Sequence, residues 1–326
     1  MDALRGVKPT GMFRITIAVD DFTDEQISHL KDVFASCARV DRIPQSSNEK
    51  TYRDVLKVSD VFVGWPDPSL VKGSAIRLLQ IGSSGWETYQ RKEILQLGIK
   101  LCTAKGIYSI GVAEHCIAMM MALVRKLPLH IKDKENRLFK RRSSAGEVTG
   151  ATACIVGMGD IGTTLAKRCK GLEMHVSAVV RRRHELDYPY VDRVFRVEDI
   201  SEAFSQADHI FLTLSAGHEN HRLIDKRILK SIQPHAFLYN VSRGSVIDEQ
   251  SLFELLKNKQ MAGAGIDVTE KEPLALDSLL WELGDQVLIT GHSAGISDHF
   301  VDRFYNLVIR NCMSFIENKP LENRVL

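Results

Sequence analysis

Three side chains that could act together on a carbonyl group lie in the second half of the sequence. Arg243, Glu272 and His292 each lie in a loop that follows a short apolar, strand-like run. A guanidinium can hold a carboxylate through two parallel hydrogen bonds. An imidazole can deliver a proton, and a nearby carboxylate can keep that imidazole charged. Each residue alone is more often structural, but the three types together would be sufficient to reduce a keto acid.

A glycine-rich turn, VGMGDIG (156–162), precedes these residues in the chain. It lies between an apolar run and the helix-like segment TTLAKRCKGLE. Gly157 permits a tight turn, Gly159 lets a pyrophosphate approach the backbone, and Gly162 lets the helix pack closely on the strand. The phosphates would then lie at the helix N-terminus, where free N–H groups and the helix dipole favour negative charge. In this context the motif predicts a dinucleotide-binding site.

The end of the next strand indicates which dinucleotide is preferred. An NAD site usually has Asp or Glu about 20 residues after the glycine motif, where it binds the ribose 2′-hydroxyl. Here Val180 is followed by Arg181, Arg182 and Arg183, whose guanidinium groups suit a 2′-phosphate. We therefore expect NADP to be preferred over NAD. The alternative is a solvated turn, since runs of like charge are often only exposed surface.

Two series of alternating strand-like and helix-like segments must position these residues. The first series runs from FRITIAVD (13–20) to IKLCTA (99–104), and the second from TACIVG (152–157) to VLIT (287–290). A long helix is expected from Ile110 to about Arg137. This alternation predicts two α/β units, each a parallel sheet with helices on both faces.

The bulk composition is ordinary for a globular enzyme and excludes little else. The 326 residues carry a formal net charge of +2, which is too mild to indicate nucleic acid or a membrane surface as a partner. The six cysteines form no C-x-x-C pair and are expected to be small buried hydrophobes in a reducing compartment. We find no signal peptide, no membrane span and no metal-binding pattern. The sequence predicts a cytoplasmic protein.

Five segments, in order and in spacing, resemble the D-isomer-specific 2-hydroxyacid dehydrogenase family over nearly the whole chain. They are VAEHCIAMMMALVRKLP (112–128), VGMGDIG (156–162), NVSRGSVIDEQSL (240–252), AGAGIDVTEKEPL (262–274) and TGHSAG (290–295). The resemblance implies two doubly wound parallel-sheet domains. A Rossmann dinucleotide-binding domain would span 106–292. A flavodoxin-like substrate domain would combine 1–105 with 293–326.

The resemblance also implies roles for the three reactive side chains. Arg243 would bind the substrate carboxylate and polarise the keto oxygen, His292 would donate the proton, and Glu272 would hydrogen-bond His292 and favour its charged form. The substrate carboxylate would further contact the backbone of Ser84 and Gly85. The expected cofactor-binding residues are Gly157, Gly159, Asp160, Ile161, Gly162, Arg181, Arg182, Leu214, Ser215, Asn220, Val241, Ser242 and Asp267.

The activity implied is D-stereospecific hydride transfer between NAD(P)H and a small 2-keto or 2-hydroxy acid, in a homodimer. A reductase of glyoxylate, hydroxypyruvate or a similar acid is favoured. A formate-type enzyme is disfavoured because that subgroup has Gln where Glu272 stands, whereas a phosphite-type dehydrogenase keeps the same three residues and stays an alternative. The alternative from another class is a cofactor-sensing interaction protein, since the family includes transcriptional corepressors. Turnover of a 2-keto acid would distinguish the two.

Four positions depart from the family pattern. Gly291 stands where Pro usually precedes the catalytic histidine, and Ser215 stands where Pro is usual. Trp86 and Glu87 stand where a smaller residue and Asp are usual. None of these changes removes a reactive group. The glycine predicts a less rigid approach to His292, and the changes together leave the substrate open.

Overall fold

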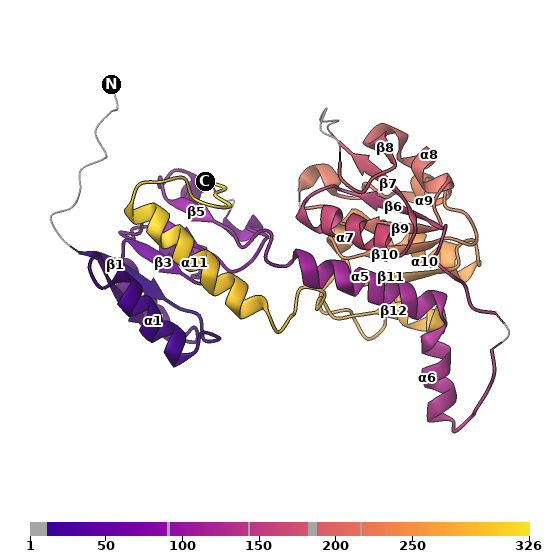
Figure 1. The fold of residues 1–326 in the computed structure, drawn as a ribbon, viewed down its shortest axis with the longest axis horizontal. Helices are drawn as coiled ribbons and strands as arrows, with labels where there is room; N and C mark the ends of the chain where they lie inside the picture. The colour runs from indigo at the N-terminus through magenta and orange to yellow at the C-terminus, as the bar shows by residue number, and fades with distance from the viewer. Residues whose placement is uncertain (1–11, 90–91, 143, 182–187, 216) are drawn as a thin grey trace. The chain divides into compact units, whose positions relative to one another are not determined.

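The computed structural model describes residues 12–89, 92–142, 144–181, 188–215 and 217–326. The chain forms two compact units (Figure 1). Unit 1 is the chain up to Ile107 together with Asp298–Leu326, and unit 2 is Tyr108–Ser297. The sequence-based break points lie after residues 105 and 292, slightly before the break points of the structure.

Unit 1 is built on a five-stranded parallel sheet with the order β2-β1-β3-β4-β5. Its strands are β1 (Phe13–Ile17), β2 (Ala38–Arg42), β3 (Val61–Val63), β4 (Leu78–Gln80) and β5 (Lys100–Cys102). Its helices are α1 (Asp24–Phe34), α2 (Glu49–Leu56), α3 (Pro68–Val71), the short η1 (Glu87–Tyr89), α4 (Lys92–Leu95) and α11 (Phe300–Ile316). The last helix returns the chain to this unit, where Phe304 and Tyr305 of α11 pack on Phe22.

Unit 2 is built on a seven-stranded parallel sheet with the order β12-β11-β10-β9-β6-β7-β8. Its strands are β6 (Thr152–Val156), β7 (His175–Val180), β8 (Arg193–Arg196), β9 (His209–Leu212), β10 (Phe237–Asn240), β11 (Gly263–Ile266) and β12 (Val287–Ile289). The chain builds outward from β6 through β7 and β8, then starts again at β9 on the other side of β6. This reversal of strand order creates the crevice where open α/β sheets bind ligands.

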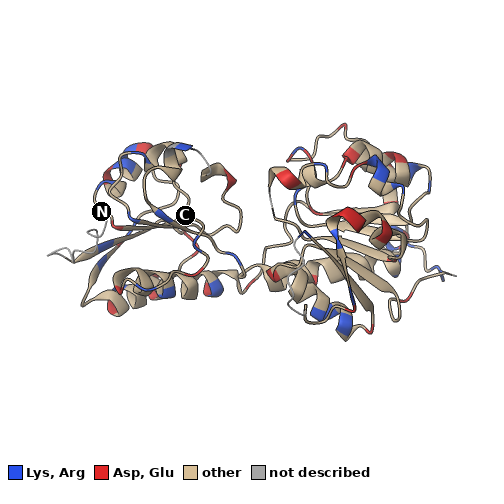
Figure 2. Cartoon of the chain, turned by 90° about the horizontal axis from the view of Figure 1, so that it is seen from above, with Lys and Arg blue, Asp and Glu red and all other residues tan. Residues whose placement is uncertain are grey.

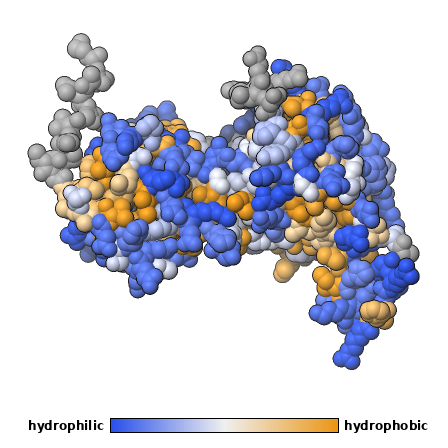
Figure 3. Space-filling model, viewed as in Figure 1, coloured by the Kyte–Doolittle hydropathy of each residue, from blue (hydrophilic) through white to orange (hydrophobic). Residues whose placement is uncertain are grey.

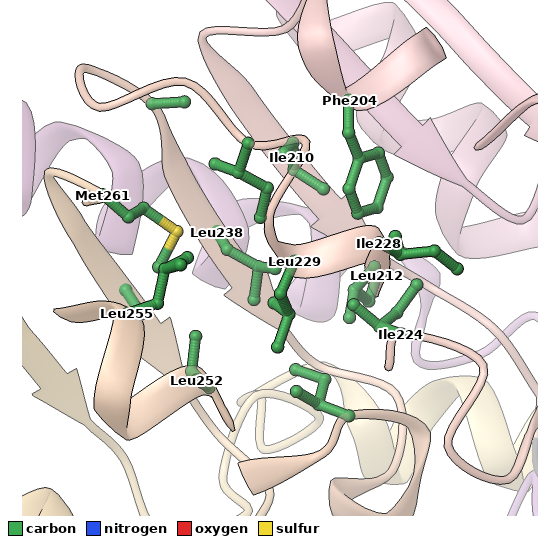
Figure 4. Close-up of a cluster of buried hydrophobic side chains, with 14 of the residues drawn as sticks. Phe204, Ile210, Leu212, Ile224, Ile228, Leu229, Leu238, Leu252, Leu255 and Met261 are labelled. Carbon is green, nitrogen blue, oxygen red and sulfur yellow. The ribbon is translucent and has the colours of Figure 1, made fainter. Parts of the chain in front are cut away.

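Helices cover both faces of each sheet (Figure 2). In unit 2 they are α5 (Ser109–Val124), α6 (Leu127–Glu135), α7 (Asp160–Gly171), α8 (Ile200–Ser205), α9 (Lys226–Leu229) and α10 (Glu249–Lys257). Short helical turns complete the unit, namely η2 (Val197–Asp199), η3 (His218–Asn220), η4 (Gly244–Val246) and η5 (Leu279–Gln286). Helices α5 and α7 pack on one face over one apolar cluster. Helices α8, α9 and α10 cover the other face, where Phe204, Leu229 and Leu255 belong to the second cluster (Figure 4).

The single helix that was expected from 110 to 137 is wrong. The structure has two helices, α5 and α6, separated at Arg125 and Lys126. Lys126 has a left-handed backbone with φ of 56°. Pro128 explains the break: it has no N–H to donate to the carbonyl four residues earlier, so α5 cannot continue through it, and it lies in the first turn of α6, where no such N–H is needed.

The predicted burial of the cysteines is confirmed for five of the six, while Cys37 is partly exposed. Burial raises the pKa of the thiols of Cys102, Cys154, Cys169 and Cys312 to about 12. These thiols pack as hydrophobes and are not nucleophiles. No helix in the described part of the chain is long and apolar enough to cross a membrane.

Candidate active site

Arg243 lies in the loop after β10, which is shaped by the last residue of that strand. The amide of Asn240 donates to the Arg243 carbonyl at 3.1 Å, and its Oδ1 accepts the backbone N–H and the hydroxyl of Ser242. The next residue, Gly244, cannot be replaced without movement, since a Cβ there would lie 1.9 Å from the carbonyl carbon of Thr269. Gly244 therefore allows the Arg243 loop to lie against the loop after β11, which carries Glu272.

Glu272 and His292 come from loops after different strands and meet. Glu272 Oε2 lies 2.7 Å from His292 Nδ1, and Glu272 Oε1 accepts the N–H of Thr269 at 3.2 Å. Both side chains stay accessible, with 38% and 52% of their surface exposed. Because an ionised carboxylate only accepts, Nδ1 carries a hydrogen toward Glu272. Nε2 is left as the nitrogen that can exchange a proton with a substrate.

Asp267, the first residue after β11, is 3% exposed. Its Oδ1 accepts the Thr290 hydroxyl at 2.6 Å and the Ser293 N–H at 2.9 Å. Its Oδ2 accepts the N–H of Ala294 at 3.1 Å. The carboxylate thus holds the turn that carries His292. That Asp267 binds the cofactor stays a prediction.

The glycine turn after β6 has the geometry that a pyrophosphate requires. Gly157 has φ of +100°, and a Cβ on Gly162 would lie 2.1 Å from the Gly157 carbonyl oxygen. Gly159 is the N-cap of α7, and the space where its Cβ would be is open to 4 Å. The first-turn residues Asp160 and Ile161 follow directly. A phosphate could therefore approach these backbone N–H groups, so the residues present fit a dinucleotide.

The loops around this turn are joined by side-chain hydrogen bonds. The Thr213 hydroxyl donates to the Gly157 carbonyl at 2.7 Å, and Leu214 lies beside the same glycine. Asn220 is 4% exposed and donates to the Ser215 carbonyl at 2.8 Å. Arg181, at the end of β7, donates from Nη2 to Asn220 Oδ1 at 2.7 Å.

Of the three consecutive arginines, only Arg181 belongs to the described residues. Arg181 is exposed, and Nη2 also donates to the Glu219 carbonyl at 3.1 Å. It ties the end of β7 to η3, so a 2′-phosphate would share this guanidinium with Asn220. Arg182 lies outside the described residues. Val241 and Ser242, two further expected cofactor residues, are buried in the loop after β10.

The expected substrate loop belongs to unit 1 and follows β4. The Ser83 hydroxyl donates to the Gly85 carbonyl at 2.8 Å, while Ser84 is exposed. Trp65 packs on Gly82 and on Phe304, and Trp86 is partly buried against the apolar cluster of this unit. Both tryptophans are packing residues here. Substrate contact by Ser84 and Gly85 stays a prediction.

Sequence reasoning missed three residues that shape this site. Gly244 could have been noticed, because a glycine directly after a reactive arginine suggests close backbone approach. Thr290 lies two residues before His292 and binds Asp267. His115 lies on α5, and its Nε2 lies 3.0 Å from the Thr290 hydroxyl oxygen. No local pattern could reveal that contact across 175 residues of sequence.

Comparison with known proteins adds an independent finding. Residues 117–294 match the family model described as D-isomer specific 2-hydroxyacid dehydrogenase, NAD binding domain. A D-3-phosphoglycerate dehydrogenase of Archaeoglobus fulgidus is 27% identical over 290 residues, covering 86% of this chain and 53% of that protein. The chain thus spans about half the length of that relative. A glyoxylate reductase of Pyrococcus furiosus is 28% identical over 248 residues, covering 74% of this chain and 73% of the other.

Solved structures share the fold. A D-isomer specific 2-hydroxyacid dehydrogenase family protein from Aeromonas salmonicida has a TM-score of 0.83 at 24% identity, covering 97% of this chain and 99% of the other. An acyclic imino acid reductase, in complex with NADPH and D-Arg, has a TM-score of 0.82 at 21% identity, covering 96% of this chain and all of the other. The predicted fold class, two doubly wound parallel-sheet domains, is confirmed.

Proposed function

The chain belongs to the D-isomer specific 2-hydroxyacid dehydrogenase family, and from this premise we propose that it reduces a small 2-keto acid to the D-2-hydroxy acid. The observation that carries the proposal is the 2.7 Å contact between Glu272 and His292. This pair follows β11 and β12 at the edge of the sheet where the carboxyl ends of the strands lie, and Arg243 follows β10 at that same edge.

Each residue of the trio has one task in the reaction. A bound reduced dinucleotide supplies the hydride that is added to the keto carbon. Arg243 binds the substrate carboxylate and draws electron density toward the keto oxygen. His292 transfers the proton on Nε2 to that oxygen, which completes the hydroxyl group. Glu272 holds Nδ1, so the ring keeps its orientation while it loses charge.

The preferred dinucleotide is proposed to be NADPH. No carboxylate follows β7 within Val180–Arg183, where an NAD site would have one to bind the ribose hydroxyls. Arg181 provides a cation at the end of β7. The solved acyclic imino acid reductase binds NADPH, so the shared fold accommodates a 2′-phosphate.

The favoured substrate is glyoxylate, hydroxypyruvate or a similar small 2-keto acid. Support comes from the glyoxylate reductases of Pyrococcus furiosus and Korarchaeum cryptofilum, each 28% identical to this chain. Ser84 and Gly85 are proposed to bind the substrate carboxylate through backbone N–H groups. Location in the cytoplasm also stays a prediction.

The assembly is proposed to be a homodimer, on the evidence of two surface segments of unit 2. One segment, residues 125–142, contains α6, which projects from the unit (Figure 1). It has eight Lys or Arg against two Asp or Glu. Four of its large apolar side chains are exposed among these charges (Figure 3), namely Leu127, Ile131, Leu138 and Phe139.

The second segment, residues 270–286, has the complementary character. It has five Asp or Glu against one Lys, and it exposes Leu276, Leu279 and Trp281. Because one segment is basic and the other acidic, the basic segment of one copy could bind the acidic segment of a second copy.

Light scattering should show a dimer, and Ile131→Ser with Phe139→Ser should shift it to monomer. A wild-type monomer at micromolar concentration would contradict the proposal.

The experiment that tests the activity is a spectrophotometric screen. Both reduced dinucleotides are offered with a panel of 2-keto acids, and oxidation of the nicotinamide is followed. We expect steady turnover with glyoxylate or hydroxypyruvate, faster with NADPH. Tight dinucleotide binding without turnover on any 2-keto acid would overturn the proposal and would favour a cofactor-sensing role.

A further inference from the structure

A short chain of hydrogen bonds connects α5 to the turn that carries His292. His115 Nε2 lies 3.0 Å from the Thr290 hydroxyl oxygen, which lies 2.6 Å from Asp267 Oδ1. His115 Nε2 itself lies 3.7 Å from the same carboxylate oxygen. This series of hydrogen bonds ends at Asp267, which is almost fully buried. All three residues belong to unit 2.

The direction of each hydrogen bond follows from the chemistry of the groups. An ionised carboxylate only accepts, and a threonine hydroxyl has a single hydrogen. Thr290 therefore donates to Asp267, and its oxygen must accept from His115. This requires the tautomer of His115 that carries hydrogen on Nε2, or the doubly protonated ring.

Asp267 in turn binds three consecutive backbone N–H groups. Its carbonyl oxygen accepts from His292 at 2.8 Å, and its carboxylate accepts from Ser293 and Ala294. His292 has a left-handed backbone with φ of 51°, which costs free energy in a residue other than glycine. The preceding Gly291 adds no stiffness, so the grip of Asp267 maintains this conformation.

The position of His115 is set by one face of α5. Met119, one turn later, lies against β11, where a Cβ on Gly265 would be 2.9 Å from its sulfur. Gly111, one turn earlier, lies against the backbone after His292, with its Cβ position 3.6 Å from the Ala294 carbonyl oxygen. Because residues four apart share a helix face, His115 faces Thr290 between these two contacts.

We propose that His115 and Thr290 are positioning residues for the proton donor. They orient the carboxylate of Asp267, and Asp267 holds the backbone turn that places His292 beside Glu272. The proposal rests on the proposed function for its kinetic consequence only. Loss of one of these hydrogen bonds would displace the His292 ring, and a displacement of about 1 Å can cost about 100-fold in rate.

Two pairs of variants separate positioning from mere packing. Thr290→Val keeps the shape and removes the hydroxyl, while Thr290→Ser restores it. His115→Phe keeps a ring and removes the donor, while His115→Gln returns an amide N–H near the position of the original Nε2. The matched control is Glu114→Gln on the same helix, because Glu114 pairs with Arg168 instead, at 2.8 Å.

Kinetics and NMR are measured on the same variants. We expect Thr290→Val and His115→Phe to lower kcat by about 10- to 100-fold. Thr290→Ser, His115→Gln and Glu114→Gln should stay within about threefold of wild type. The imidazole resonances of His292 should shift in the first pair and return in the conservative variants.

The outcomes distinguish this proposal from the proposed function. If the wild type reduces no 2-keto acid, the function fails, and the His292 resonances still test the positioning. Unchanged His292 resonances in Thr290→Val and His115→Phe would overturn the positioning proposal. So would wild-type kcat in these two variants, or an equal loss in the conservative ones.

Discussion

The seven-stranded sheet has one histidine next to a carboxylate at the carboxyl ends of its strands and another at their amino ends. The two histidines differ in solvent exposure and in pairing. At the carboxyl ends of the strands, His292 is half-exposed, bound to Glu272 at 2.7 Å and held in a left-handed conformation. At the amino ends, His209 begins β9 and is 3% exposed. It stacks on Phe237 and lies 3.2 Å from the Tyr239 hydroxyl.

Burial explains most of the difference between His209 and His292. It lowers the pKa of His209 to about 4, against an ordinary value of 6.5, although neighbouring Asp208 acts in the opposite sense. Asp208 itself binds the Thr152 N–H and lies 3.0 Å from His235. A neutral, enclosed imidazole can only stabilise, whereas an accessible one with an orienting carboxylate can exchange protons. Solvent access and the orientation of the neighbouring carboxylate therefore decide whether a histidine can exchange protons, and proximity to a carboxylate alone does not.

The strongest test of the comparison replaces the exposed histidine. His292→Asn tolerates the left-handed backbone and removes the proton donor, so kcat should fall by about 1,000-fold. Dinucleotide binding, followed by fluorescence, should persist. His209→Gln, at the other edge, should retain wild-type kcat. A fully active His292→Asn would remove this residue from the mechanism.

A second test concerns the cation at the same edge as His292. Arg243→Lys keeps the charge and loses the planar fork that binds a carboxylate with two hydrogen bonds. We expect kcat/KM for the keto acid to fall by about 100-fold, as measured by steady-state kinetics. Lys230→Arg, on the surface after α9, serves as the control. Unchanged kinetics in Arg243→Lys would argue against bidentate binding.

His209, at the amino ends of the strands, should make the free energy of unfolding depend on pH. The pKa of His209 is lower in the folded than in the unfolded protein, so its contribution is complete above about pH 6.5. It is lost as pH falls from there toward about 4, because the unfolded chain binds the proton first. The loss should be on the order of 3 kcal/mol in the free energy of unfolding.

Urea unfolding at pH 7.5 and pH 4.5 measures this loss. A Trp65→Phe/Trp86→Phe background leaves Trp281 as the single tryptophan, which reports on unit 2. His209→Gln in that background should lose less stability between the two pH values. Equal losses with and without His209 would show that another group dominates.

The smallest effect is expected at the end of β7. Arg181→Gln removes a guanidinium already shared with Asn220, so it should raise the KM for NADPH about tenfold more than that for NADH. Initial rates with each dinucleotide measure the ratio. An equal effect on both would identify Arg181 as a structural tie between β7 and η3.

The sequence was sufficient for the features that depend on local pattern. Apolar runs bounded by turns predicted most of the strands, but β2 and β8, whose sequences ARVDR and RVFR are largely charged, were missed. The spacing of Gly157, Gly159 and Gly162 predicted the turn whose crowding the structure shows. The types and order of Arg243, Glu272 and His292 identified the candidate chemistry. The helix break before Pro128 was also readable, but the continuous apolar pattern obscured it.

Which groups bind one another depends on how separate elements pack together in three dimensions. Gly244 lies against Thr269 because the sheet places the loops after β10 and β11 side by side. His115 Nε2 lies 3.0 Å from the Thr290 hydroxyl because α5 packs closely on β11, where Met119 lies against Gly265. Hydrogen bonds are short and directional, so a shift of 1 Å makes or breaks them. Periodicity and composition specify which face of an element is buried, and they contain no information at that scale.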